Sequence, residues 1–329
     1  MRILLSTVLC VIAGVAGAAP LPALHADINE TSVSGVSAGG YLAVQFGVAH
    51  SAIVRGVGAI AAGPYYCADA NLAIALSTCL NGEPPVASSL ALTASWAAAG
   101  LIDSTDNLKH QRIWLFSGTH DSVVKPTVVH ALVDYYAALL PKSAIQSIFN
   151  IPASHGFVTN DFGSACDNSG KDYIVNCGFD AAGEILKQIY GTLKPRATQL
   201  GGKILEFPQK EFAPEGRDTQ LAELGYAYIP ADCAVGKPCK IHIALHGCLQ
   251  DAARIGNAFY SRAGYNAWAD ANAIIVLYPQ VASSSLLPFN PNACWDWWGY
   301  TGVDYAQKTG PQIQAIYAML QRLAGKAGK

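Results

Sequence analysis

Short apolar runs alternate with longer segments of helical periodicity along most of the chain. A short apolar run bounded by turn residues is typical of a buried strand, whereas apolar residues three to four apart are typical of a helix. The alternation favours an α/β protein whose mainly parallel sheet carries helices on both faces. The expected strands are Thr31–Ser34, Arg55–Ile60, Arg112–Phe116, Ser147–Ile151, Ile204–Phe207, Leu224–Ile229, Lys240–Leu245 and Ala273–Tyr278. The expected helices are Gly39–His50, Thr127–Leu139, Asp180–Tyr190, part of Ala252–Asn272, and Gln312–Leu323.

Two segments show neither periodicity, Pro64–Leu80 and Ser283–Tyr300. Loops held by a rigid scaffold carry binding residues more often than the scaffold does. We therefore expect these two irregular segments to contribute to a binding surface.

The amino-terminal pattern is typical of a secretory signal. Met1 and Arg2 precede the apolar run Ile3–Ala16, and an A-x-A cleavage pattern lies at Ala16–Ala18. The run is shorter than the roughly 20 residues that a membrane span needs. We expect residues 1–18 to be a signal peptide, the mature chain to be secreted into the extracellular space, and no later segment to enter a membrane.

Composition and charge exclude several classes of partner. No linker, repeat or low-complexity tract interrupts residues 19–329, which predicts a single domain. The sequence has 21 Lys and Arg against 23 Asp and Glu, and only 13% of residues are charged. Without a basic surface, we expect no nucleic-acid partner and no membrane partner, and we expect a monomer.

The nine cysteines predict disulfides. Cys10 lies in the expected signal, and an even set of eight in an exported chain indicates a disulfide framework. Local spacing favours Cys67–Cys79, Cys166–Cys177 and Cys233–Cys239, which leaves Cys248–Cys294. No C-x-x-C pair occurs and histidines do not cluster with cysteines, so we expect no metal site. Nothing in the sequence indicates a cofactor.

A serine lies between glycines close to the start of the mature chain. Gly35-Val36-Ser37-Ala38-Gly39 fits G-x-S-x-G, the nucleophile elbow, in which serine occupies a sharp turn from a strand to a helix. A glycine-rich turn can also carry a serine for steric reasons alone. The elbow interpretation therefore requires a base and an acid elsewhere in the chain.

Candidates for both follow in the order serine, acid, histidine, which is the order of α/β-hydrolases. Asp121 follows the expected strand Arg112–Phe116, and His155 follows the next one. Both would lie at the carboxyl edge of a parallel sheet, where functional groups gather. His120 is an alternative base, but its position beside Asp121 favours a loop residue.

The remaining element of such a site is an oxyanion hole. Its first donor is the amide after the nucleophile, here that of Ala38, and its second comes from a loop after an early strand that is often marked His-Gly. The matching residues, His246 and Gly247, follow the strand Lys240–Leu245, far downstream of the serine. The elements that ordinarily precede the elbow thus come last, which predicts a circularly permuted α/β-hydrolase fold. An isolated His-Gly pair would more simply be a buried histidine at a strand end.

These motifs together resemble the extracellular polyhydroxybutyrate depolymerases, in particular the single-domain fungal type with a permuted catalytic domain. The segments that carry the resemblance are Gly35–Tyr41, Gly118–Asp121, Ser154–Phe157, Leu245–Gln250 and Cys294–Tyr300.

The resemblance implies a role for each motif. Ser37, Asp121 and His155 match the catalytic triad, and the backbone amides of Ala38 and Cys248 match the oxyanion hole. A bridge from Cys248 to Cys294 would tie that hole to an aromatic loop. Buried core positions are the commoner place for tryptophan, but aromatic side chains also line pockets for apolar ligands. The substrate-binding candidates are Trp295, Trp297, Trp298, Tyr300 and Tyr65.

The sequence thus predicts a secreted serine esterase that hydrolyses a poly(3-hydroxybutyrate)-type polyester or its oligomers through an acyl-enzyme intermediate. A first alternative is a carboxylesterase for feruloyl or acetyl groups on polysaccharide. A second alternative, from another class, is a catalytically silent secreted binding protein on a hydrolase scaffold.

Overall fold

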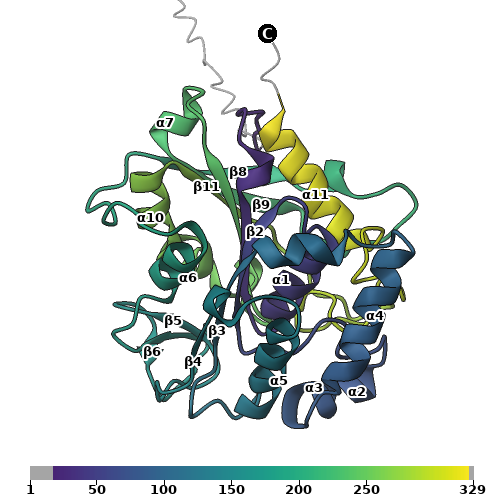
Figure 1. Cartoon of the computed structure of the whole chain (residues 1–329). Coiled ribbons are helices and arrows are strands. Elements are labelled where there is room, and N and C mark those ends of the chain that lie inside the picture. Colours follow the sequence, from purple (N-terminus) through teal and green to yellow (C-terminus); the bar gives the residue numbers. More distant parts are fainter. Residues whose placement is uncertain (1–17, 326–329) are drawn as a thin grey trace, which may run out of the picture.

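An eight-stranded sheet runs through the computed structural model, which describes residues 18–325 (Figure 1). The predicted signal peptide therefore lies outside the described residues except for Ala18. The order of strands across the sheet is β4-β3-β2-β1-β10-β11-β9-β8. Strands β1 to β4 and β10 to β11 pair in parallel, whereas β9 pairs antiparallel with both β11 and β8. The strands span Thr31–Val36 (β1), Val54–Ile60 (β2), Arg112–Phe116 (β3), Ile145–Ile148 (β4), Lys203–Pro208 (β8), Leu224–Ile229 (β9), Lys240–Leu245 (β10) and Ile274–Tyr278 (β11).

Helices cover both faces of this sheet (Figure 1). One face carries α6 (Ala181–Tyr190) and α10 (Tyr265–Asn272). The other face carries α1 (Ala38–Ala49), α4 (Val86–Ala98), α5 (Pro126–Ala137) and α11 (Pro311–Ala324). Every residue of α1 is buried, in agreement with its apolar character on all sides.

Short elements complete the chain. The short α-helices are α2 (Leu72–Leu76), α3 (Thr78–Asn81), α7 (Ala231–Ala234), α8 (Ala252–Ile255) and α9 (Ala258–Arg262). The 3₁₀ turns are η1 (Ile28–Glu30), η2 (Thr105–His110), η3 (Lys142–Ala144) and η4 (Lys210–Phe212). A separate three-stranded sheet of order β5-β7-β6 is formed by β5 (Phe157–Thr159), β6 (Ser164–Ala165) and β7 (Ile174–Asn176).

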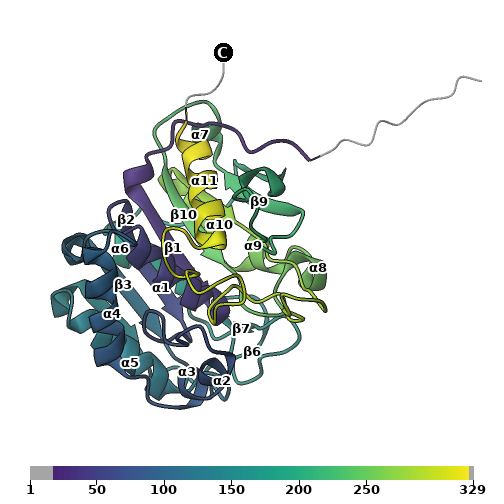
Figure 2. The ribbon, with the colours of Figure 1, turned by 90° about the vertical axis from the view of Figure 1, so that its right-hand side faces the viewer.

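The first strands of the chain lie beside late ones. Strand β1 pairs with β2 on one side and with β10 on the other, and Figure 2 shows purple β1 next to green β10. The start and end of the described chain also meet, because the amide of Leu24 donates to the carbonyl of Leu323 (2.9 Å). Adjacent ends are what allows a domain to be permuted without loss of its core. The structure is a circularly permuted α/β-hydrolase fold with a mainly parallel sheet.

Three parts of the chain differ from what the sequence pattern predicts. Helix α4 was not expected, because only Ser89 and Thr93 of its residues are buried and the segment lacks an apolar stripe. The segment Pro64–Leu80, expected to be irregular, contains α2 and most of α3. Strand β4 begins and ends earlier than Ser147–Ile151, because the chain turns after Ile148 to pack against the loop that follows β3.

Four disulfides fasten the loops. They join Cys67 to Cys79, Cys166 to Cys177, Cys233 to Cys239 and Cys248 to Cys294, the pairs that the spacing favours. Within residues 18–325 the structure has no helix with the length and hydropathy that crossing a bilayer requires.

Candidate active site

Ser37 occupies the sharp turn between β1 and α1. Its backbone has φ 56° and ψ −125°, a conformation that residues other than glycine rarely adopt. The glycines around it allow close backbone contact: a Cβ at Gly35 would lie 2.3 Å from the carbonyl carbon of Gly39, and one at Gly39 would lie 2.3 Å from the carbonyl oxygen of His246. The turn therefore requires small neighbours, and it leaves Ser37 partly exposed at the carboxyl edge of the sheet.

Asp121 and His155 form a buried pair at the same edge. His155 Nδ1 lies 2.8 Å from Asp121 Oδ2, and the two residues are 6% and 5% exposed. The other carboxylate oxygen, Oδ1, accepts hydrogen bonds from the amides of Val123 and Val124, both at 2.9 Å. With both oxygens engaged, the carboxylate fixes the ring so that its second nitrogen, Nε2, remains available as a base.

Backbone contacts hold the two loops of this pair together. The amide of Thr119 donates to the carbonyl of Ile151 (2.9 Å), and that of His120 donates to the carbonyl of Ala153 (3.2 Å). A Cβ at Gly118 would lie 2.1 Å from the Ala153 carbonyl oxygen, so this approach requires glycine. His120 contributes its backbone to this contact, whereas its side chain is exposed.

Ser37 and His155 line one cavity of about 370 Å³. Within residues 18–325 no hydrogen bond joins the Ser37 hydroxyl to the imidazole. Contacts of this kind are often long before substrate binds and shorten in the reacting complex. The arrangement can support nucleophilic attack by Ser37 with His155 as the base and Asp121 as the group that orients the base.

Two backbone amides near Ser37 are candidates for an oxyanion hole. Ala38 is the first residue of α1, and Cys248 lies in the loop after β10. In the part of the chain that the structure describes, neither amide donates a hydrogen bond to another protein atom. Cys248 lines the cavity and Ala38 follows Ser37, which also lines it, so the two free amides are the candidate donors to an oxyanion there.

His246 orients the second of these amides. Burial lowers the pKa of its imidazole to about 4, so the ring is neutral near pH 7. Its Nε2 accepts a hydrogen bond from the amide of Val281 (3.3 Å), which leaves the proton on Nδ1, and Nδ1 donates to the carbonyl of Gly247 (2.7 Å). Because a peptide unit is planar and trans, fixing the Gly247 carbonyl fixes the direction of the Cys248 N–H.

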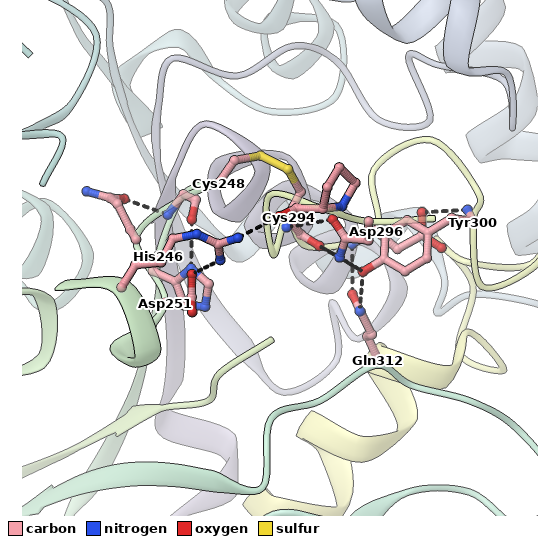
Figure 3. The surroundings of a disulfide bond; sticks show 12 residues. His246, Cys248, Asp251, Cys294, Asp296, Tyr300 and Gln312 are labelled. Carbon is pink, nitrogen blue, oxygen red and sulfur yellow. Dashed lines mark hydrogen bonds and ion pairs between the residues drawn. A yellow bond between two sulfur atoms is a disulfide. The ribbon is translucent and has the colours of Figure 1, made fainter. Parts of the chain in front are cut away.

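The Cys248–Cys294 disulfide joins this loop to the aromatic segment, residues 294–300, which precedes α11 (Figure 3). In Figure 3, His246 and Asp251 lie on one side of the bridge, and Asp296, Tyr300 and Gln312 on the other. Two hydrogen bonds hold this segment in place. The Tyr300 hydroxyl donates to the Cys294 carbonyl within the segment (2.7 Å), and the Asp296 amide donates to Gln312 Oε1 of α11 (2.8 Å).

Asp296 shapes the aromatic segment from within. Its carboxylate is 1% exposed and accepts hydrogen bonds from the amides of Trp298, Gly299, Tyr300 and Thr301, and from the Thr301 hydroxyl, at 2.6–3.2 Å. Burial raises the pKa of this carboxyl, although the five hydrogen bonds favour its charged form. These bonds curl the backbone so that Trp297 and Trp298 reach the cavity.

The structure corrects three of the expected aromatic contacts. Trp297, stacked on Tyr41 at 4.6 Å, and Trp298 do line the cavity. Trp295 is fully buried against His246, and Tyr65 is fully buried with its hydroxyl donating to the carbonyl of Ala306 (2.7 Å). Tyr300 does not line the cavity, and its hydroxyl donates to the carbonyl of Cys294, a residue that does. These three aromatic residues support the loops instead of lining the cavity.

Several cavity residues were not expected from the sequence. They come from the two segments expected to form a binding surface and from the loop before β7. They are Leu72, Leu76, Leu80, Phe289, Asn290 and Tyr173. Their spacing carries no chemical motif. The location of the two segments indicated the first five, and nothing in the sequence indicated Tyr173.

No group of three or more His, Cys, Asp or Glu side chains in residues 18–325 is arranged to hold a metal ion.

Comparisons with known proteins place the chain among one class of enzymes. It is 41% identical over 327 residues to a poly(3-hydroxybutyrate) depolymerase of Delftia acidovorans, covering 97% of this chain but 65% of that protein. It is 38% identical over 323 residues to a polyhydroxybutyrate depolymerase of Talaromyces funiculosus, covering 93% of both chains. No protein-family profile matches the sequence.

Two solved structures are similar over nearly their full length. One is the crystal structure of a PHB depolymerase from Penicillium funiculosum, and the other is a serine-to-alanine PHB depolymerase complexed with an R3HB trimer. Each has a TM-score of 0.87 and 36% identity, covering 93% of this chain and 99% of the solved chain.

Proposed function

Since the chain belongs to the polyhydroxybutyrate depolymerase family, we propose that it is a secreted serine esterase that hydrolyses poly(3-hydroxybutyrate)-type polyester or its oligomers. The observation that carries the proposal is the cavity in which an elbow serine meets a histidine held by a buried carboxylate. The four disulfides agree with an extracellular location for the enzyme.

In the proposed reaction, His155 Nε2 takes the proton of the Ser37 hydroxyl while Ser37 Oγ attacks the ester carbonyl. Asp121 stabilises the imidazolium that forms, and the amides of Ala38 and Cys248 donate to the tetrahedral oxyanion. His155 then returns the proton to the alcohol that leaves. Water, activated by the same imidazole, releases the acyl group and restores Ser37.

The cavity suits an aliphatic ester without charges. Its walls are mainly apolar and include Leu76, Val123, Trp297 and Trp298. Large apolar side chains also lie exposed around it, among them Leu72 (48% exposed), Leu76 (54%) and Phe289 (55%), and Leu287 of the neighbouring loop is 91% exposed. Contiguous exposed apolar residues commonly mark a binding surface, and a polyester is a ligand of that kind.

The test compares wild-type protein with Ser37→Ala. The wild type should release hydroxy acid from polyhydroxybutyrate particles, and an organophosphate probe should label Ser37. Ser37→Ala should lose both properties and retain the unfolding midpoint of the wild type.

The same assay separates the alternatives. Faster hydrolysis of feruloylated or acetylated sugars than of polyhydroxybutyrate would indicate a carboxylesterase of polysaccharides. A folded wild type that neither labels nor hydrolyses any of these esters would indicate a binding protein.

A further inference from the structure

The Gln250 side chain connects the loop of the proposed oxyanion donor with the segment that supports the proposed base. Gln250 is 1% exposed. Its Oε1 accepts a hydrogen bond from the amide of Gly247 (2.6 Å), and its Nε2 donates to the carbonyls of Asp172 (3.0 Å) and Tyr173 (2.8 Å). A primary amide has two N–H donors and one carbonyl oxygen, so every polar group of this side chain is engaged.

The carbonyl of Tyr173 in turn supports the loop of His155. It accepts a second hydrogen bond, from the amide of Phe157 (2.7 Å), two residues after the histidine. A Cβ at Gly156 would lie 2.6 Å from this same oxygen, so the histidine loop rests directly on it. Tyr173 itself has φ 49°, which is unfavourable for tyrosine and has to be held by such contacts.

On the other side, Gln250 completes the support of the oxyanion loop. The Gly247 amide is held by Gln250, and the Gly247 carbonyl is held by His246. Gly247 is thus fixed at both ends, and the following amide, that of Cys248, is directed accordingly. The bond from Gln250 to Tyr173 spans 77 positions of sequence and joins the loop after β10 to the segment before β7, a strand of the separate three-stranded sheet.

We propose that Gln250 is a positioning residue that sets the distance between the Cys248 amide and the His155 imidazole. This inference rests on the proposed function, in which the amide and the imidazole act on one tetrahedral intermediate at the same time. A displacement of about 1 Å in such a site can reduce the rate roughly 100-fold.

A second glutamine offers a matched control. Gln111 is also 1% exposed, and its Nε2 donates to the carbonyl of Gly47 (2.8 Å). It is a buried glutamine like Gln250, but it does not line the cavity. A change at Gln111 therefore measures the structural cost of losing a buried glutamine side chain.

The experiment compares Gln250→Met with Gln111→Met on a soluble short-chain ester, with active sites counted by organophosphate labelling. Gln250→Met should lower kcat per labelled site roughly 10- to 100-fold with KM little changed. Gln111→Met should lower the unfolding temperature and leave kcat per labelled site at the wild-type value.

A pH series on Gln250→Glu adds a readout that a structural role would not change. In this variant an ionised carboxylate at position 250 would be repelled by the carbonyl oxygens of Asp172 and Tyr173. A protonated carboxyl group would again offer one donor and one acceptor. The ratio of variant kcat to wild-type kcat should rise as pH falls toward 5. The wild-type enzyme, measured at the same pH values, corrects for the pH dependence that the two enzymes share.

Wild-type kcat per labelled site in Gln250→Met would overturn the role of Gln250. So would a kcat ratio for Gln250→Glu that stays constant with pH, and this second measurement decides the matter if the methionine variant does not fold. A wild type that neither labels nor hydrolyses the ester would overturn the proposed function together with this inference. An active wild type with unaffected Gln250 variants would overturn the inference alone.

Discussion

Removing the Cys248–Cys294 disulfide should affect stability and catalysis together. The bridge joins residues 46 positions apart, whereas Cys233–Cys239 joins residues 6 positions apart. In the chain-entropy description, opening the longer loop raises the conformational entropy of the unfolded chain and so lowers its free energy by about 4 kcal/mol. Opening the shorter loop lowers it by about 2 kcal/mol. Changing both members of the first pair to alanine should therefore lower the free energy of unfolding by about 2 kcal/mol more than the same change in the second pair.

The catalytic effect should distinguish the two bridges even more clearly. The amide of Cys248 belongs to the proposed oxyanion hole, and its bridge holds it against the segment that Asp296 shapes. Loss of one oxyanion donor costs roughly 100-fold or more in kcat, so a loosened donor should cost about 10-fold. The Cys233–Cys239 bridge lies outside the cavity, and its removal should leave kcat unchanged.

Urea denaturation followed by tryptophan fluorescence gives the two free energies of unfolding. Turnover of a soluble ester, divided by the number of sites labelled with an organophosphate, gives kcat. Equal losses of stability in the two double variants, together with wild-type kcat after removal of Cys248–Cys294, would refute this reasoning.

Three further changes have defined outcomes. Asp121→Asn places an amide donor against Nδ1 of His155 and should lower kcat by roughly 10⁴-fold, measured on a soluble ester, with KM nearly unchanged; a loss of less than about 10-fold would argue against the assigned acid. Burial lowers the pKa of His50 to about 4, so the unfolded chain takes up a proton below pH 6.5 before the folded chain does, and stability falls as pH falls through this window. His50→Phe should reduce the loss of unfolding free energy between pH 7 and pH 5 by about 2 kcal/mol in parallel urea titrations, and an unchanged loss would contradict the assignment. Leu286 and Leu287 are 77% and 91% exposed, so changing both to serine should weaken adsorption to polymer particles in a sedimentation assay while kcat/KM on a soluble ester stays constant; unchanged adsorption would exclude this loop as a polymer contact.

The local pattern of apolar and polar residues was sufficient to predict most strands of the sheet and the order of the proposed catalytic groups along the chain. Buried parallel strands are apolar along their length, so β2, β3 and β10 are visible as short runs in the sequence. Helix α4 was not visible, because the helix lies at the surface and its small residues give no apolar stripe. The β5-β7-β6 sheet was also missed, because its strands are only two or three residues long.

Some features of this protein are determined by the sequence alone. A side chain at Gly35 would meet the backbone of Gly39 four residues away, so this steric requirement of the turn is local. The cysteine spacing and the order of Ser37, Asp121 and His155 are likewise properties of the linear chain. Together they predict a permuted hydrolase with a serine nucleophile, because each depends on contacts within a few residues or on chain order.

Only the tertiary structure decided which side chains face the cavity and which support it. Trp295 and Trp297 lie two positions apart in one irregular segment, yet the first is buried and the second lines the cavity. Their directions follow from the hydrogen bonds of Asp296, and a loop has no periodicity from which to read them. The same holds for Gln250, whose partner Tyr173 is 77 positions away in sequence and becomes its neighbour only in the folded chain.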